Sequence, residues 1–274
     1  MRRLIWRTLA YAFLIAYALP ILYPLFFITV SSMKSNDAIF ITPWAMPESV
    51  NVDSYTKVWT EFNLGRYFLN SVYYAGAATL IAVTISAMAS YGVTRLRWKL
   101  KGVVFGMILL GLMVPIHSEL VPIYIIMTKL GVREPRVALP LVYIAFAMPI
   151  TVFIVSGYMR SIPRAIEESA VMEGASIQRC FFTIVLPVAK PAMATVLMFN
   201  FITIWNDFFA ALVFINQDSE KTIQLGIAGL KGVFVTQYSD LLAAVVIAII
   251  PSVIVYALLQ DKIVEGMTAG AVKG

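Results

Sequence analysis

The sequence is poor in the residues that most often bind metals, form disulfides or catalyse reactions. Its 274 residues contain one cysteine, Cys180, and one histidine, His117, and only 13% of them are charged. A lone cysteine permits no internal disulfide, and with a single histidine it gives no metal cluster. The sequence also has no G-x-x-x-x-G-K-S/T loop for ATP and no H-E-x-x-H motif. We therefore expect no catalytic residue, no metal site and no cofactor bound by this chain.

Hydrophobic residues, by contrast, are in surplus. They make up 60% of the chain, against roughly 45–50% in soluble domains, where about 25% of residues are charged. One soluble core could not enclose so many apolar side chains, so a lipid bilayer is their natural surroundings. In a membrane protein, the net charge of +6 bears on which side of the membrane the basic segments occupy. We therefore expect no nucleic-acid partner.

Six segments are long and apolar enough to cross a bilayer as helices, which takes about 20 residues each. The sequence thus predicts an all-α polytopic membrane protein. The first segment follows three arginines, as a signal peptide would, but it is too long for a signal core and lacks a small-residue cleavage site. We interpret it as a retained helix. The six expected spans are residues 9–31, 68–94, 102–128, 137–158, 191–215 and 241–260.

The distribution of basic residues predicts the orientation. Six spans place both termini on one side, and Lys and Arg favour the cytoplasmic side. With the N-terminus inside, the inner segments hold 13 basic residues and the outer segments hold 8. Both termini are therefore expected in the cytoplasm. The run Arg95, Arg97, Lys99 and Lys101 is interpreted chiefly as a topology signal, with contact to membrane lipid as a minor possibility.

The longest cytoplasmic piece, residues 159–190, has the pattern of a helix–turn–helix. Ala170 and Gly174 are four residues apart and present one helical face without bulk, so another surface can approach closely. Gly174 also permits the chain to turn, and Ser176 can cap a second helix that begins at Ile177. The sequence predicts an exposed docking segment here.

The same loop resembles a known family. Permease subunits of binding-protein-dependent ABC importers carry the pattern E-A-A-x-x-x-G-x9-I-x-L-P, and every spacing is kept here. Ser169 replaces the first alanine of the pattern, a change between small residues, and Glu173 stands where many members have aspartate. The matching residues are Glu168, Ser169, Ala170, Gly174, Ile184, Leu186 and Pro187.

Three further segments narrow the resemblance to the smaller permease of maltose-type systems. The tail 266–274 is similar to the C-terminus of that subunit. Trp205-Asn206-Asp207 resembles its W-N-D/E element, and Asn70-Ser71 also fits. Essentially the whole chain takes part in the resemblance, including its length and number of spans.

The resemblance implies a type I ABC importer permease fold with a cytoplasmic coupling helix, in one transmembrane domain over residues 1–274. It implies a bacterial or archaeal inner-membrane protein that is not itself an enzyme. The implied partners are a second homologous permease, a dimer of ATPase subunits that uses ATP and Mg, and an extracytoplasmic solute-binding protein. The implied cargo is a carbohydrate, such as an oligosaccharide, a disaccharide, a polyol or a glycerol-phosphate derivative.

Its mechanism would be alternating access driven by the partner ATPase. The tail 266–274 would reach between the ATPase subunits, and the outer loop 216–240 would contact the binding protein. The residues expected to couple the permease to the ATPase are Glu167, Glu168, Ser169, Ala170, Glu173, Gly174, Ile184, Leu186 and Pro187.

Polar residues inside the expected spans are candidates for the substrate path. An acid in a span costs about 2.5–3.5 kcal/mol on insertion scales, so Asp207 should face protein or water. Asn200 lies about two turns earlier on the same helical face, and Trp205 and Asn206 are adjacent in sequence. These four residues either line or gate the pore, or Asp207 only fixes helix packing.

The sequence leaves open the position of His117 and Glu119 and the energy source of transport. His117 and Glu119 lie between Pro115 and Pro122, either in a broken helix along the translocation path or at a helix end near the outer interface. The chain could also be an ion-coupled secondary transporter, although it has few intramembrane acids beyond Asp207. Dependence of uptake on ATP would separate that alternative from an ABC importer.

Overall fold

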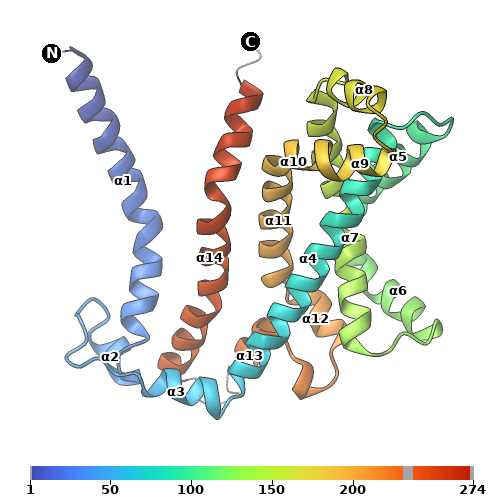
Figure 1. Cartoon of the computed structure of the whole chain (residues 1–274). Coiled ribbons are helices and arrows are strands. Elements are labelled where there is room, and N and C mark those ends of the chain that lie inside the picture. The colour runs from blue at the N-terminus through green and yellow to red at the C-terminus, as the bar shows by residue number, and fades with distance from the viewer. Residues whose placement is uncertain (1, 231–236, 272–274) are drawn as a thin grey trace. The chain divides into compact units, whose positions relative to one another are not determined.

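The computed structural model describes residues 2–230 and 237–271, and every element in that part of the chain is a helix (Figure 1). The all-α prediction is confirmed. The tail 266–274 and the loop 216–240 lie partly outside the described residues. The elements are α1 Arg2–Ser31, α2 Asn36–Ile41, α3 Asp53–Thr60, α4 Leu64–Thr94, α5 Lys101–Leu110, the 3-10 helix η1 Gly111–Met113, α6 Ile116–Lys129, α7 Pro135–Ser161, α8 Ala165–Met172, α9 Ile177–Arg179, the π-helix η2 Cys180–Val185, α10 Leu186–Val188, α11 Lys190–Trp205, α12 Phe209–Phe214, the 3-10 helix η3 Asp218–Glu220, α13 Ile223–Gly229 and α14 Tyr238–Ala271.

Four of the expected spans are single long helices. Segments of α1, α4, α7 and α14 are apolar over 25 to 31 residues, enough to cross a bilayer. α4 begins four residues and α7 two residues before the expected spans. Pro135 fits the first turn of α7 because no amide donor is needed there. Length and hydropathy therefore locate these four helices well.

The third expected span is broken. α5 and α6 meet at an angle of 108° instead of continuing as one helix over residues 102–128. Val114 precedes Pro115 and takes an extended conformation (φ −86°, ψ 121°), as steric conflict with a following proline ring favours. At the end of α5, a Cβ on Gly111 would lie 2.7 Å from Cγ of Pro149, so this glycine lets the chain approach α7 closely.

The fifth expected span, residues 191–215, also ends early. α11 stops at Trp205, and the separate short helix α12 follows after a break. Asp207 therefore lies in the break and not inside a continuous helix, which corrects its predicted position. The other end of α11 is bent by 76° from the helical segment Ile177–Val188. The described residues thus contain four single helices that are candidate spans, or up to six candidate spans if each bent pair counts as one.

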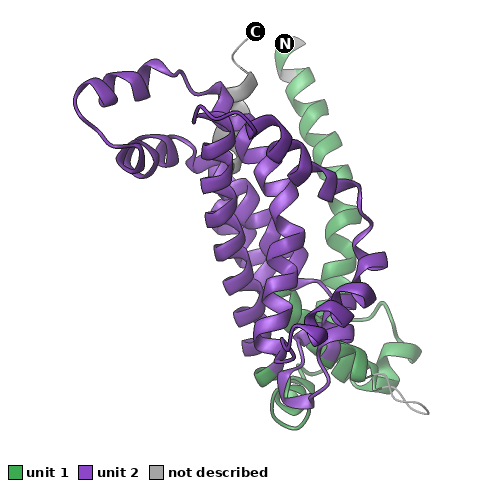
Figure 2. Ribbon diagram, turned by 90° about the vertical axis from the view of Figure 1, so that its right-hand side faces the viewer, with its two compact units in different colours: residues 1–66, 226–250 green, residues 67–225, 251–274 purple. Residues whose placement is uncertain are grey.

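The chain divides into two compact units, which Figure 2 colours separately. The first comprises residues 1–66 and 226–250. Within it, Nζ of Lys57 donates a 2.7 Å hydrogen bond to Oδ2 of Asp240, and this carboxylate raises the pKa of the Lys57 ammonium. The backbone amide of Tyr238 donates to Oδ1 of Asn36 (2.8 Å). These contacts join the α2–α3 region to the start of α14.

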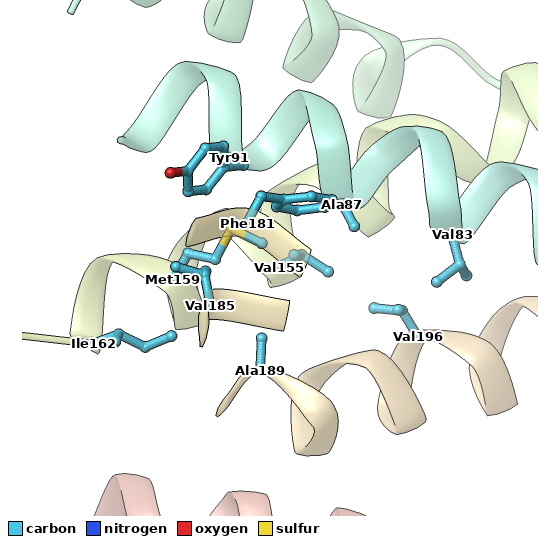
Figure 3. Packing of buried hydrophobic residues seen from close by; sticks show 10 residues of the cluster. All are labelled: Val83, Ala87, Tyr91, Val155, Met159, Ile162, Phe181, Val185, Ala189 and Val196. Carbon is cyan, nitrogen blue, oxygen red and sulfur yellow. The ribbon is translucent and has the colours of Figure 1, made fainter. Parts of the chain in front are cut away.

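The second unit, residues 67–225 and 251–274, contains the predicted coupling loop and the polar residues of the fifth span. Its apolar core joins α4, α7, η2 and α11 (Figure 3). Phe181 and Val185 of η2 point into this core, and the Phe181 ring lies 5.1 Å from that of Tyr91 on α4. The remaining members of the cluster are Val83, Ala87, Val155, Met159, Ile162, Ala189 and Val196.

Asn70 and Ser71 brace the first part of the loop 216–240 against α4. Nδ2 of Asn70 donates to the carbonyl oxygen of Ser219 at 3.0 Å. Oγ of Ser71 accepts a 2.8 Å hydrogen bond from the amide of Ile223. Asn70 and Ser71, which fit the family resemblance, therefore provide hydrogen-bond partners for backbone groups that have none within a helix.

Candidate functional site

Residues 159–190, the predicted coupling loop, form the expected helix–turn–helix. Gly174 has φ +86°, a left-handed conformation that glycine adopts without a Cβ penalty. Its amide donates to the carbonyl of Val171 (3.0 Å), and the amide of Ala175 donates to that of Ala170 (2.9 Å). This pair of bonds is a Schellman motif, which ends α8. Oγ of Ser176 then accepts from the amide of Arg179 (3.2 Å) and caps the next helix, as predicted.

Most of α8 is open to its surroundings. Among its residues, only Glu167 and Ala170 are partly covered. Apolar side chains stay exposed along the loop, including Val171 at 56% and Met172 at 84%. Single exposed apolar residues are common in proteins, but a succession on one protruding segment is typical of an interaction surface.

An ion pair fixes the base of this exposed segment. Nε of Arg95, just after α4, lies 3.1 Å from Oε1 of Glu167, and the two side chains are only 5% and 13% exposed. The Arg95 guanidinium also donates to the carbonyl oxygens of Met159 and Ile162, at the end of α7. One arginine thus joins α4, α7 and α8. Glu167, expected among the coupling residues, faces this anchor, whereas Glu168 and Ser169 are exposed.

The second part of the motif runs through a π-helix. The wider π turn of η2 is rare in proteins and frequently marks a functional site. Val185 is fully buried in the core, while its neighbours Ile184 and Leu186 are half-buried and Pro187 is exposed. The motif residues therefore divide between an exposed tip, at Glu168–Gly174, and a packed base that continues through α10 into α11.

A cavity of about 520 Å³ lies in the same unit, at the other end of α11. Residues from the broken α5–α6 segment, from α7 and from α11–α12 line it. Most of these side chains are apolar, and a few polar groups converge, which is typical of a small-molecule site. The polar lining residues are Glu119, Tyr143, Asn200, Thr203 and Asp207.

Two of the four expected substrate-path residues line this cavity. Asp207 accepts hydrogen bonds at Oδ2 from the Tyr143 hydroxyl (2.8 Å) and from the amide of Ala211 (3.1 Å). Nδ2 of Asn200 donates to Oγ1 of Thr151 on α7 at 2.8 Å. Both alternatives for Asp207 thus have support, because the carboxylate lines a cavity and also ties α7 to α12.

The other two residues face elsewhere. Trp205 is only 1% exposed and packs against Phe68 and Phe201, with ring centroids 5.5 and 5.7 Å away. Asn206 is exposed, and its Nδ2 donates to the carbonyl of Ile202 in the preceding turn (2.8 Å). We assign Trp205 to packing and Asn206 to the end of α11.

The packing role of Trp205 gives a testable expectation. Trp205→Ala should lower the amount of folded permease in the membrane, because truncation of a buried tryptophan costs about 3–5 kcal/mol. Trp205→Phe should keep most of the folded protein and of its uptake. Immunoblots of membrane fractions and the thermal midpoint of the purified protein measure this. A Trp205→Ala protein of normal stability with a raised KM would instead show that the ring contacts solute.

The break near His117 and Glu119 matches the interpretation of a broken helix. Glu119 lies in the first turns of α6 and lines the cavity. The centroid of the His117 ring lies 4.9 Å from that of the Phe209 ring, and the two rings are tilted by 60°. The structure also adds two residues that the sequence did not single out for function. Tyr143 lies in an apolar run, where its hydroxyl is the one feature that could indicate a functional role. Arg95 belongs to the basic run that we interpret as a signal for membrane orientation.

The described residues thus form an all-helical chain with four to six candidate membrane spans, a cavity between helices and an exposed loop that carries the motif. Residues 81–268 match the family described as binding-protein-dependent transport system inner membrane component. The chain belongs to this family and is the permease component of an ABC importer, a multi-pass inner-membrane protein.

Relatives and solved structures agree with this membership. The chain is 32% identical to the diacetylchitobiose uptake system permease protein NgcG of Streptomyces coelicolor, over 96% of this chain and 88% of that protein. It is 29% identical to the melibiose/raffinose/stachyose import permease protein MelC of Bacillus subtilis, over 92% and 91%. A bacterial ABC transporter that imports the acidic polysaccharide alginate has a chain of the same fold, with a TM-score of 0.81 and 22% identity, over 94% of this chain and 96% of that one.

Proposed function

We propose that this permease imports a carbohydrate by alternating access, as one of two homologous pore subunits. A dimer of separate ATPase subunits binds ATP and Mg and seats α8 in a cleft. An extracytoplasmic binding protein delivers the solute to the opposite face. This chain itself holds no catalytic residue and no cofactor, and both of its termini face the cytoplasm.

The names of the relatives support a carbohydrate as the cargo. They describe permeases for diacetylchitobiose and for melibiose, raffinose and stachyose. The cavity suits such a solute, because aromatic faces from Phe146 and Phe199 accompany hydroxyl, amide and carboxylate groups. The binding-protein partner has support from a related alginate transporter, which was solved in complex with a periplasmic protein that holds an alginate pentasaccharide.

One observation supports the coupling mechanism. α11 follows the docking segment at one end and contributes residues to the cavity lining near its other end. The helix begins at Lys190, directly after the motif residues of α10, and it carries Asn200 and Thr203 into the cavity lining near its other end. At about 1.5 Å of rise per residue, these 16 residues form a rod of about 24 Å. If α8 and η2 move, α11 would move with them as a rigid rod and would shift the residues that line the cavity.

Reconstitution into sealed vesicles tests the proposed energy source. The permease is co-expressed with its neighbouring permease and ATPase genes, purified as a complex and loaded with ATP inside the vesicles, with the binding protein outside. We expect labelled sugar to accumulate only with hydrolysable ATP. The same vesicles with ionophores that dissipate ion gradients are the control, and accumulation should persist. Uptake that needs the gradient and ignores ATP would establish the ion-coupled alternative.

A further inference from the structure

The charges that line the cavity are all of one sign. Glu119 from α6 and Asp207 from the α11–α12 break both contribute carboxylates. Among the described residues that line this space, none is lysine, arginine or histidine. His117, on the same turn of α6 as Glu119, packs its ring against that of Phe209 at a tilted angle and is not a lining residue. A solute in the cavity therefore meets two carboxylates and no basic lining residue, while His117, beside the lining, lies close enough to Asp207 to interact with its charge.

The geometry around Asp207 leaves room for a ligand. The Tyr143 hydroxyl and the Ala211 amide both donate to the same oxygen, Oδ2. An ionised carboxylate offers about four acceptor sites on its two oxygens. The Ala210 amide is a third donor to this carboxylate. The remaining acceptor capacity can take a hydroxyl or an ammonium group of a solute, and hydrogen bonds of this charge-assisted kind are the stronger ones.

The surroundings strengthen the effect of these charges. The cavity walls are mostly apolar, with Phe146, Pro149 and Ile150 from α7 and Phe199 from α11. In such a setting the local dielectric constant is far below that of water, so repulsion between like charges is strong at contact distances. An anionic solute would lose its hydration and meet two carboxylates, whereas a neutral or cationic solute would not be repelled.

We propose that Glu119 and Asp207 set the charge selectivity of this permease, so that it passes neutral sugars and amino sugars and rejects sugar acids. This inference rests on the proposed function, since it assigns the cavity to the solute path. The alginate importer has the same fold and handles an acidic polysaccharide. The fold alone therefore does not exclude anions, and the selection must come from side chains such as these two.

Charged thiol reagents test the proposal without knowledge of the natural cargo. Thr203 and Ala145 both line the cavity and are exposed to it, so each is changed to cysteine in the complete complex. The wild-type chain is the blank, because its single cysteine, Cys180, is 1% exposed. The probes are cationic trimethylammonium-ethyl methanethiosulfonate and anionic sulfonatoethyl methanethiosulfonate, with rates normalised to those of free mercaptoethanol.

We expect both cavity thiols to react at least about tenfold faster with the cationic probe, after normalisation. The additional changes Glu119→Gln and Asp207→Asn, which keep shape and remove charge, should bring this ratio close to one. A ratio near one in the parent, a ratio that the double change leaves untouched, or no reaction of either thiol with either probe would overturn the proposal. ATP-driven uptake by the unmodified complex is measured in parallel, so that failure here is distinct from failure of the import function.

Protection by sugars extends the test to solutes of the proposed class. Millimolar lactose, a glucosamine disaccharide or digalacturonate is added before the uncharged probe methyl methanethiosulfonate. We expect the neutral and the amino disaccharide to slow the reaction of Thr203→Cys, and the uronate to leave it unchanged. Equal protection by the uronate would overturn the charge selectivity, and no protection by any of the three would remove the cavity from the solute path.

Discussion

A Gly174→Asp permease should reach the membrane in normal amount and yet fail to couple ATP hydrolysis to uptake. A Cβ at Gly174 would meet nothing within 4 Å in this chain, and aspartate tolerates a left-handed backbone better than most residues. The new carboxylate would instead project into the contact with the ATPase. An unpaired charge in a desolvated contact costs several kcal/mol, and about 3 kcal/mol already corresponds to roughly a hundredfold loss of affinity.

The chain supplies a matched control for this experiment. Gly131, between α6 and α7, also has a positive φ (+79°), and a Cβ there would likewise meet nothing within 4 Å. Gly131→Asp therefore adds the same side chain at a similar backbone cost, away from the coupling loop. Uptake and ATPase rates of both variants are measured in reconstituted vesicles. If Gly174→Asp imports at the wild-type rate, or if both variants fail alike, α8 does not couple as proposed.

Arg95→Met should be the most damaging change at the base of the coupling segment. It would leave Glu167 nearly buried without its cation and would remove the donor to the carbonyl oxygens of Met159 and Ile162. Loss of one partner from a buried ion pair costs about 3–5 kcal/mol. We expect a lower thermal midpoint of the purified complex, faster proteolysis within residues 159–190 and loss of most uptake.

Two variants make this prediction specific. Arg97 lies on the same basic run and is exposed, so Arg97→Met removes the same charge without the buried contacts. It should leave stability and uptake near wild type. Arg95→Met combined with Glu167→Met removes both charges and should regain part of the lost stability, because no buried carboxylate remains unpaired. Equal effects of Arg95→Met and Arg97→Met would show that net charge, not the anchor, matters.

Much of the fold could be predicted from hydropathy and local chemistry. α4, α7 and α14 follow from the length of their apolar runs, and the Gly174 turn and the Ser176 cap follow from residue type. These features depend on a few neighbouring residues, so the sequence carries their signal directly. The exposed position of Glu168 and Ser169 also agrees with the motif, although their contact with an ATPase stays a prediction.

The helix breaks were harder to predict, because they depend on tertiary packing. The apolar run continues through Val114, so hydropathy gave no sign of an interruption there, and after Trp205 only Asn206 and Asp207 interrupt an otherwise apolar run. Pro115 was visible, but a proline can also kink a helix that continues. Asp207 lines the cavity whereas Trp205 packs away from it. This difference involves the contact of Asp207 with Tyr143 on another helix, which no local sequence pattern contains. The π turn of η2 has a similar origin, since it keeps Phe181 and Val185 in the core.

The long helix α4 offers a fixed frame for spectroscopy of the transport cycle. Ser71, near its N-terminal end, holds the first residue of α13, while Arg95, just past its C-terminal end, holds α7 and α8. The 24 residue steps from Ser71 to Arg95 correspond to about 36 Å along an α-helix, and α4 contains no proline to bend it. Labels on α4 can therefore serve as an internally rigid reference, so that a changed distance reports movement of the second labelled segment relative to this helix.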